Sequence, residues 1–252
     1  MSSRPAATAV STAGRLRAST VPVAALRRRD RDAAYDVFAQ LYDGTCRTRF
    51  ERDLDDKQLV IVLRDGSDGA LRGFSTIGLS RRLTPVGDAT VLFSGDTVVD
   101  RAYWGQKALQ REFVSNLLRL KLTRPARPLL WFLVSKGYRT YLLMANSCRR
   151  SIPAHQPASP ALRATLDQLA VERFAERYDA VAGVVRNVGG RHERVRRGVA
   201  PVPEGLPKRN RHVAAFLARN PGHQDGDELA CLAVIGLDDL VRSAGRSAAA
   251  TV

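Results

Sequence analysis

Residues 89–134 carry the pattern that decides the fold, and they read ATVLFSGDTVVDRAYWGQKALQREFVSNLLRLKLTRPARPLLWFLV. The apolar, β-branched run over 89–99 predicts a strand, and the leucine and phenylalanine stripe that follows predicts an amphipathic helix over 105–122. Two prolines end that helix, and 129–134 predicts a short buried strand. This spacing is typical of a βαβ crossover, so we expect the two strands to be parallel neighbours.

The rest of the chain alternates helical and strand patterns around this crossover. The patterns predict helices over 31–41, 47–54, 136–146, 159–178 and 212–219, and strands over 58–64, 71–79, 180–188 and 228–235. The first two of these strands are joined by a turn at 65–69 and should be antiparallel. The fold class is therefore α/β, with a sheet of mixed direction.

Charge divides the chain into a candidate domain and two ends. Residues 1–29 hold six arginines and no acid, which predicts a disordered basic tail, with an organellar transit peptide as the alternative. We expect one domain over 30–240 and a flexible tail over 241–252. The basic stretch 186–211 is interpreted as a solvated loop, or else as a loop that docks a phosphate or a partner.

The net charge of +15 favours polyanionic partners such as nucleic acid, cofactor phosphates, acidic carrier proteins or anionic membrane surfaces. Nucleic-acid binding is disfavoured, because no aromatic residue lies between Tyr178 and Phe216 to stack on bases in the basic stretch. No membrane span is expected, since the longest strongly apolar run, 129–134, is far short of the roughly 20 residues required.

Several chemistries lack their motifs in this sequence. The three cysteines are widely spaced without a CxxC pair, which argues against a disulfide framework or a zinc site and favours a reducing, cytoplasmic location. The four histidines have no ligand or triad spacing, so we expect no metal. Patterns of serine hydrolases, zincins, P-loops and EF-hands are missing too.

The turn between the first strand of the crossover and its helix is a candidate anion site. Gly105-Gln106 stands at the head of the helix, where free backbone N–H groups and the helix dipole attract a phosphate. Most turns of this kind bind nothing, so the residues alone leave both interpretations open.

Residues 98–109 resemble the acyl-CoA-binding motif of the GNAT N-acyltransferase superfamily, which is approximately Val-x-Pro-x-Tyr-Arg-Gly-Gln-Gly-x-Gly. Tyr103, Gly105 and Gln106 match, whereas Trp104, Lys107 and Leu109 depart from the pattern. The order of elements over about 20–238 also follows the superfamily. The resemblance implies a mostly antiparallel mixed sheet with a central parallel βαβ crossover and helices on both faces.

The resemblance also implies an activity, the transfer of an acyl group from acetyl-CoA or another acyl-CoA to an amine by direct attack. The donor-binding residues carried over from the motif are Val98, Val99, Gly105, Gln106, Lys107 and Ala108. A tyrosine on the helix after the second crossover strand serves as the acid in the family. We prefer Tyr141 to Tyr138 for this role, although a tyrosine pair that closes the core explains both.

A base is harder to predict from the sequence. On a regular strand Asp96 would share one face with Ser94 and Val98, and an acid in an apolar strand is costly unless it is paired or functional. A salt bridge to an arginine explains it equally well. His223, Asp227 and Glu228 lie in a stretch that turn chemistry explains, with an active-site loop as the alternative.

The departures from the motif keep two alternative functions open. The Lys107 side chain narrows the space for a pyrophosphate, while its ammonium could bind one. The alternatives are an N-acyl synthase that uses an acidic acyl carrier protein as donor, and a GNAT-fold protein that binds without catalysis.

Overall fold

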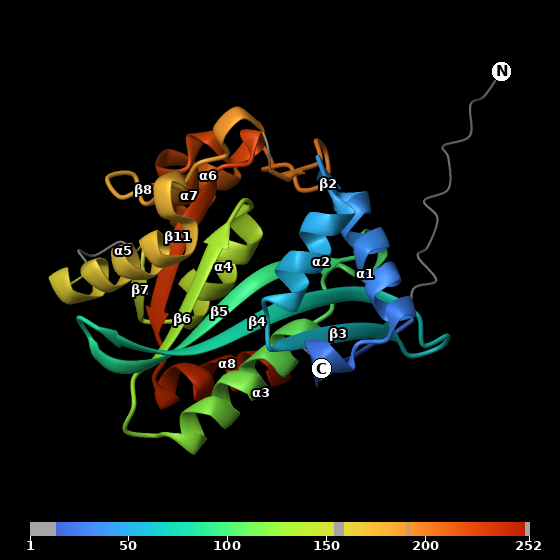
Figure 1. Cartoon of the computed structure of the whole chain (residues 1–252), viewed down its shortest axis with the longest axis horizontal. Helices are drawn as coiled ribbons and strands as arrows, with labels where there is room; N and C mark the ends of the chain where they lie inside the picture. The colour runs from blue at the N-terminus through green and yellow to red at the C-terminus, as the bar shows by residue number, and fades with distance from the viewer. Residues whose placement is uncertain (1–13, 154–158, 191, 250–252) are drawn as a thin grey trace.

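The computed structural model describes residues 14–153, 159–190 and 192–249, which build a nine-stranded mixed sheet with helices on both faces (Figure 1). The sheet runs in the order β1-β3-β4-β5-β6-β11-β9-β8, and β7 pairs with β11. Its strands are β1 (Leu16–Pro22), β3 (Leu59–Asp65), β4 (Leu71–Thr84), β5 (Gly87–Val99), β6 (Leu129–Ser135), β7 (Arg150–Ile152), β8 (Tyr178–Asp179), β9 (Val184–Val185) and β11 (Glu228–Val234). A separate pair joins β2 (Tyr42–Asp43) to β10 (Arg194–Val195).

The crossover predicted from residues 89–134 is confirmed. Strands β5 and β6 are parallel from Thr90↔Leu129 to Ser94↔Leu133, and the other strand pairs of this sheet are antiparallel. Helix α3 (Ala108–Thr123) connects the two strands. The predicted fold class, a mostly antiparallel α/β sheet with one central parallel crossover, is therefore correct.

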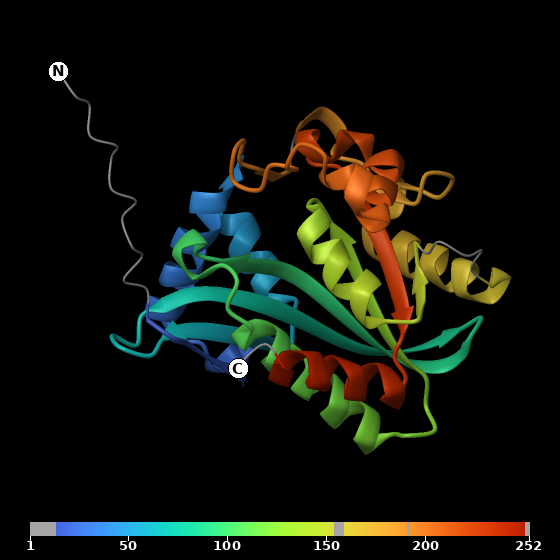
Figure 2. The same cartoon turned by 180° about the vertical axis from the view of Figure 1, so that it is seen from behind.

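Helices cover both faces of the sheet. One face carries α1 (Arg28–Leu41), α2 (Arg47–Asp55) and α5 (Pro160–Phe174). The other carries α3, α4 (Tyr138–Ser147), α7 (Arg211–Arg219) and α8 (Leu237–Ala249), with the short α6 (Leu206–Arg209) before α7. Figure 2 shows α8 alongside α3 on this second face. No helix in the described part of the chain is both long and apolar enough to cross a membrane.

The predicted N-terminal tail is wrong for the described residues from 14 onward. Strand β1 pairs with β3 over its whole length and buries Leu16 in the core, while Arg15 and Arg17 point to solvent. An edge strand needs only one apolar face, so its basic, alternating sequence resembles that of a solvated segment. Residues 1–13 lie outside the described residues.

The C-terminal boundary also differs from the prediction. Helix α8 runs to Ala249, past the expected domain end at 240, because Leu240 is buried and the Asp239 carboxylate accepts the Gly236 N–H at the start of the helix. The long strand predicted over 180–188 is wrong, because only the two-residue β9 is a strand in that range and β8 lies just before it. Residues 250–252 lie outside the described residues.

Candidate active site

Strand β5 carries a β-bulge in its centre. Its pairing with β4 runs through Ser94↔Ile77 and resumes at Thr97↔Ser75, so that Gly95 and Asp96 together face a single residue of β4. The parallel pairing with β6 ends at Ser94. Beyond this point β5 and β6 part, which opens the edge of β5 from residue 95 to residue 99.

The bulge overturns the expected alternation along β5. Ser94 lies on the α3 side, where its hydroxyl accepts the indole N–H of Trp131 at 2.9 Å. Val98 packs on the opposite side with α1 and α2, because the extra residue shifts the alternation by one. The expectation that Ser94, Asp96 and Val98 share one face was therefore wrong.

Gly95 and Lys57 hold the bulge in place. A Cβ on Gly95 would collide with Thr76 Oγ1 and would lie 3.2 Å from Lys57 Cε, so the position has no room for a side chain. The Lys57 ammonium is fully buried beside the bulge, 2.9 Å from the Asp53 carboxylate and 3.5 Å from that of Asp56. A buried charge with two partners fixes this part of α2 against β5.

A cleft of about 810 Å³ opens where β5 and β6 part. Its walls come from α2, the β5 bulge, the turn before α3, the start of α4, the end of α5 and the 192–200 segment. Among the residues that line it are Asp53, Asp96, Thr97, Gly105, Lys136, Tyr138, Glu193 and Glu228. The cleft thus combines an open strand edge with several charged side chains.

Asp96 is the carboxyl group at the bulge, and it is half-buried. Burial raises its pKa to about 7, with a further contribution from the nearby negative charges of Asp53 and Glu228. The positive charges of Lys136 and Lys57 oppose this shift. No ion pair is recorded for Asp96 in the described chain, so the salt-bridge interpretation finds no support, and the carboxyl is suited to exchange a proton near neutral pH.

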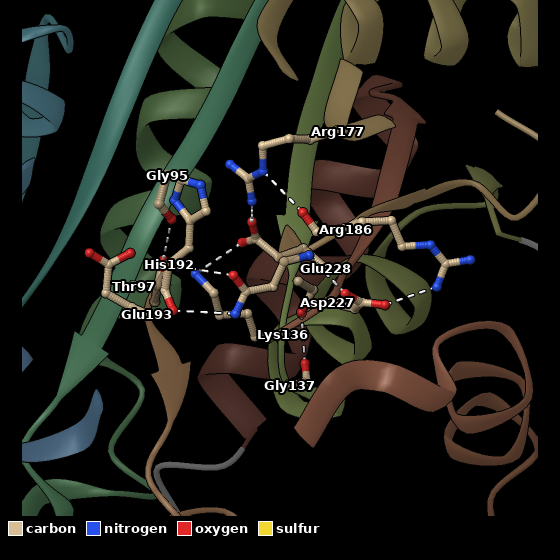
Figure 3. A network of polar contacts seen from close by, with 12 residues as sticks. Gly95, Thr97, Lys136, Gly137, Arg177, Arg186, His192, Glu193, Asp227 and Glu228 are labelled. Carbon is tan, nitrogen blue, oxygen red and sulfur yellow. Dashed lines mark hydrogen bonds and ion pairs between the residues drawn. The ribbon is translucent and has the colours of Figure 1, made fainter. Parts of the chain in front are cut away.

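An ion-pair network of Lys136, Arg177 and Glu228 lines the same cleft as Asp96, and Figure 3 shows its three members. Lys136 Nζ lies 3.2 Å from Glu228 Oε1, and Arg177 Nη2 lies 3.7 Å from Glu228 Oε2. Burial disfavours the charged ammonium, but the surrounding negative groups, Glu228 foremost, raise the pKa of Lys136 above its usual value. Lys136 is therefore a fixed positive charge in the same cleft as Asp96, whose pKa it lowers.

Burial also raises the pKa of the Tyr42 hydroxyl to about 12, since its ring stacks on Phe38 beside Lys136. Tyr42, Asp53, Lys136 and Glu193 were not singled out in the sequence. Only the fold brings β2, α2, the end of β6 and the 192–200 segment together.

The two candidate tyrosines lie in different surroundings. Tyr138 begins α4 and lines the cleft, although most of its surface is buried. Tyr141 is 2% exposed, packs against Phe216 and directs its hydroxyl to the Pro153 carbonyl oxygen at 3.5 Å. Burial raises the pKa of Tyr141 to about 12. Of the two, Tyr138 is the one that borders the cleft.

The turn before α3 has the backbone of an anion site. Gly105 has φ +94°, and Lys107 takes the N-cap position of α3 without a side-chain capping bond. The first N–H groups of a helix have no partner within it, and Ala108 and Leu109 provide two of them. Gln106 is occupied elsewhere, because its side-chain amide bonds the Leu16 N–H at 2.8 Å and the Gly14 carbonyl at 3.0 Å.

The backbone groups of Val98 and Val99 face opposite edges of β5. Asp100 N–H donates to Arg72 O at 2.8 Å, so by the alternation of an antiparallel ladder Val98 pairs with β4, while Thr97 and Val99 present their backbone groups to the open edge. The Val99 carbonyl accepts the Trp104 indole N–H at 2.7 Å. Arg139 lies 4.7 Å over the Trp104 ring. Trp104, which departs from the GNAT motif, thus covers part of this edge.

The three candidates His223, Asp227 and Glu228 have different surroundings. Glu228 lines the cleft, whereas Asp227 pairs with Arg186 at 2.9 Å and His223 packs on Phe216. No group of three or more His, Cys, Asp or Glu that could hold a metal occurs among residues 14–153, 159–190 and 192–249.

Comparisons with known proteins give matches only among solved structures. No protein-family model matches the chain, and the search of curated proteins found no match. Structural matches include a probable N-acyltransferase from Enterococcus faecalis (17% identity, 52% of this chain and 32% of that one, TM-score 0.38). A GNAT family N-acetyltransferase from Escherichia coli in complex with CoA matches at 15% identity over 54% of this chain and 67% of that one, with a TM-score of 0.34.

A GNAT family acetyltransferase from Brucella melitensis in complex with acetyl-CoA matches at 17% identity over 45% of this chain and 74% of that one, with a TM-score of 0.31. The described chain spans only about a third of the Enterococcus protein. Two of these three structures are described as GNAT family acetyltransferases, and residues 98–109 of this chain resemble the motif of that superfamily. Likeness at this level identifies no substrate, and it is the topology above that confirms the predicted fold class.

Proposed function

We propose that the chain transfers an acyl group from an acyl-CoA thioester to an amine. The observation that carries the proposal is the juxtaposition at the β5 bulge. The open backbone edge at Thr97 and Val99 lies next to Asp96, whose pKa is about 7, inside one cleft. An extended amide-bearing chain can pair with such an edge, and a carboxylate beside it can take a proton.

The donor's phosphates fit the N-terminus of α3. Free N–H groups at this helix end attract anions, and Lys107 adds an exposed positive charge beside Gly105. From there the pantetheine arm would follow the open edge of β5, where Val99 N–H and the Thr97 backbone are its partners. The thioester would then lie at the bulge. Gln106 would support this turn through β1 rather than touch the donor.

The reaction needs one base and one acid. The nitrogen lone pair of a neutral amine forms the C–N bond with the thioester carbonyl carbon, and the C–S bond breaks. Asp96 takes the proton that leaves the nitrogen. Tyr138 gives its hydroxyl proton to the departing thiolate and regains one from solvent, so the products are an amide and a free thiol.

Thiol release from acetyl-CoA and hexanoyl-CoA in the presence of a panel of amines tests the proposal, with mass spectrometry of the amide product. Asp96→Asn should lower turnover by about 100-fold or more if the carboxyl is the base. Asp88→Asn is the matched control, because it makes the same change at the other end of β5, where Asp88 pairs with Arg81. This control should leave turnover unchanged.

Two results would overturn parts of this proposal. Wild-type turnover in Asp96→Asn would remove Asp96 from the role of base. If the wild-type chain neither releases thiol with any amine nor binds CoA in calorimetry, the acyltransferase assignment itself is wrong.

A further inference from the structure

A second, smaller cavity lies behind the bulge, and we infer that it binds the hydrocarbon chain of an acyl group longer than acetyl. This inference rests on the proposed function. The cavity has a volume of about 70 Å³ and lies between α3, α4 and α8 on the far side of β5 and β6. Neither the motif over 98–109 nor the donor's phosphates account for it.

The cavity adjoins the main cleft. Both hollows share five residues of their walls, namely Thr97, Leu109, Gln110, Thr140 and Leu143. Ser94 and Trp131 line the smaller cavity where β5 and β6 begin to part. A thioester at the bulge would therefore have its acyl carbons directed at the mouth of this cavity.

The wall is made largely of hydrocarbon. Its apolar members come from three helices, β6 and the segment after β11, and they are Leu109, Phe113, Val114, Leu117, Trp131, Leu143, Cys148, Ile235 and Leu240. The wall also carries eight polar residues, namely Ser75, Ser94, Thr97, Gln110, Thr140, Ser147, Asp239 and Ser243, and several of them already have partners. The hydroxyls of Ser75 and Thr97 bond one another at 2.8 Å. Ser94 accepts the Trp131 N–H, and Asp239 accepts the Gly236 and Arg149 N–H groups. A cavity of this kind offers water few hydrogen bonds and favours an apolar guest.

One polar atom at the junction lacks a partner. Gln110 Oε1 is enclosed and accepts no hydrogen bond in the part of the chain that the structure describes, although it borders both hollows. A buried acceptor without a donor is unfavourable, so a ligand N–H at this place would stabilise it. The pantetheine arm carries an amide N–H two carbons from the thioester sulfur. A turn of the Gln110 side chain into the junction would let that N–H donate to its oxygen while the acyl chain enters the cavity.

The test compares acetyl-CoA with hexanoyl-CoA in the wild-type chain and in variants that fill the cavity. Each buried methylene strengthens binding by about fourfold, so the wild-type kcat/KM for hexanoyl-CoA should exceed that for acetyl-CoA by about tenfold or more. Val114→Phe from α3 and, as a second variant, Ser147→Leu from α4 should each abolish this preference. Leu122→Phe is the matched control, since Leu122 is 61% exposed on the same helix as Val114 and should keep the wild-type ratio.

The outcomes separate this inference from the proposed function. The acyl-chain site is wrong, and the proposed transferase activity is kept, if acetyl-CoA is turned over with a kcat/KM at least equal to that of hexanoyl-CoA. The same conclusion follows if the preference for hexanoyl-CoA survives in both cavity-filling variants. If neither donor is turned over, calorimetry with acetyl-CoA and hexanoyl-CoA tests the acyl-chain site instead. The acyl-chain site is supported, without the transfer reaction, if hexanoyl-CoA binds more tightly than acetyl-CoA and this difference is lost in Val114→Phe but kept in Leu122→Phe. Equal binding of the two donors, or no binding of either, overturns the site.

Discussion

The Lys136 ammonium lies 3.2 Å from the Glu228 carboxylate, and the two side chains are only 13% and 11% exposed. They meet because Lys136 directly follows β6 and Glu228 begins the antiparallel β11 beside it. The two charges act on Asp96 in opposite directions, since Lys136 lowers its pKa and Glu228 raises it. The pair thus adjusts the pKa of Asp96, which burial and Asp53 raise.

Removing either member of this pair should move the Asp96 pKa in opposite directions. Lys136→Met should raise the pKa above about 7, and Glu228→Gln should lower it. The midpoint of kcat/KM against pH should follow, and the carbon-13 shift of the Asp96 carboxyl gives the same value without turnover. Shifts of one sign in both variants would contradict this account. Glu228→Gln should also lose about 3 kcal/mol of stability, because the nearly buried Lys136 loses its ion-pair partner, whereas Lys136→Met leaves Glu228 paired with Arg177 and should lose less.

Asp96 should make the protein less stable as pH rises. Its folded-state pKa of about 7 lies above the usual value of 3.8, so between these values the folded state binds more protons than the unfolded state. Stability is then lost as pH rises from about 4 to about 7. Asp96→Asn removes this pH dependence. The difference in melting temperature, variant minus wild type, should therefore be larger at pH 8 than at pH 5. A difference that does not depend on pH would mean that the Asp96 pKa is not raised.

Gly95→Ala should damage the bulge and the activity together. The added methyl group collides with Thr76 Oγ1 and crowds Lys57, so we expect a loss of about 2 kcal/mol in the free energy of unfolding and a large loss of turnover. Gly78→Ala is the control on β4, because its Cβ would lie 3.5 Å from Lys57 Cδ, an ordinary contact. Chemical denaturation and turnover of both variants check this. Equal effects at the two positions would show that the bulge has no special role.

Conservative substitutions distinguish the roles of the two candidate tyrosines. Tyr138→Phe should lower kcat by about 100-fold if its hydroxyl protonates the thiolate, with little change in donor affinity. Tyr141→Phe should leave kcat unchanged, because its hydroxyl makes only a 3.5 Å contact with Pro153 O away from the cleft. The reverse pattern would return the role of acid to Tyr141, the residue that the sequence favoured.

The sequence predicts the crossover well because periodicity is local. Residues 89–134 change from a strand pattern to a helical one and back, and the structure follows these boundaries to within a few residues. The bulge at Gly95 was not predictable in the same way, because an extra residue is defined only against the partner strand. A straight strand was the reasonable assumption, and it placed Ser94 and Val98 on the same face.

The rest of the site depends on tertiary contacts that no local pattern encodes. Lys136 and Glu228 are 92 positions apart, and each resembles an ordinary surface charge in the sequence. Tyr138 and Tyr141 share a helical face, but the packing of α4 decides which of them borders the cleft. Strand β1 was missed because Arg15, directly before it, and Arg17, exposed within it, outweighed the single buried leucine between them.

The last prediction concerns Lys107, which stands where the GNAT motif has glycine. If its ammonium binds a donor phosphate, Lys107→Ala should weaken CoA binding by about fivefold at low salt and reduce the salt dependence of the affinity. Arg124→Ala makes the same charge change at the other end of α3, roughly 25 Å away, and should have no effect. Calorimetry at two salt concentrations compares them. Equal losses in both variants would indicate diffuse attraction by the net charge of +15 rather than a phosphate site at this turn.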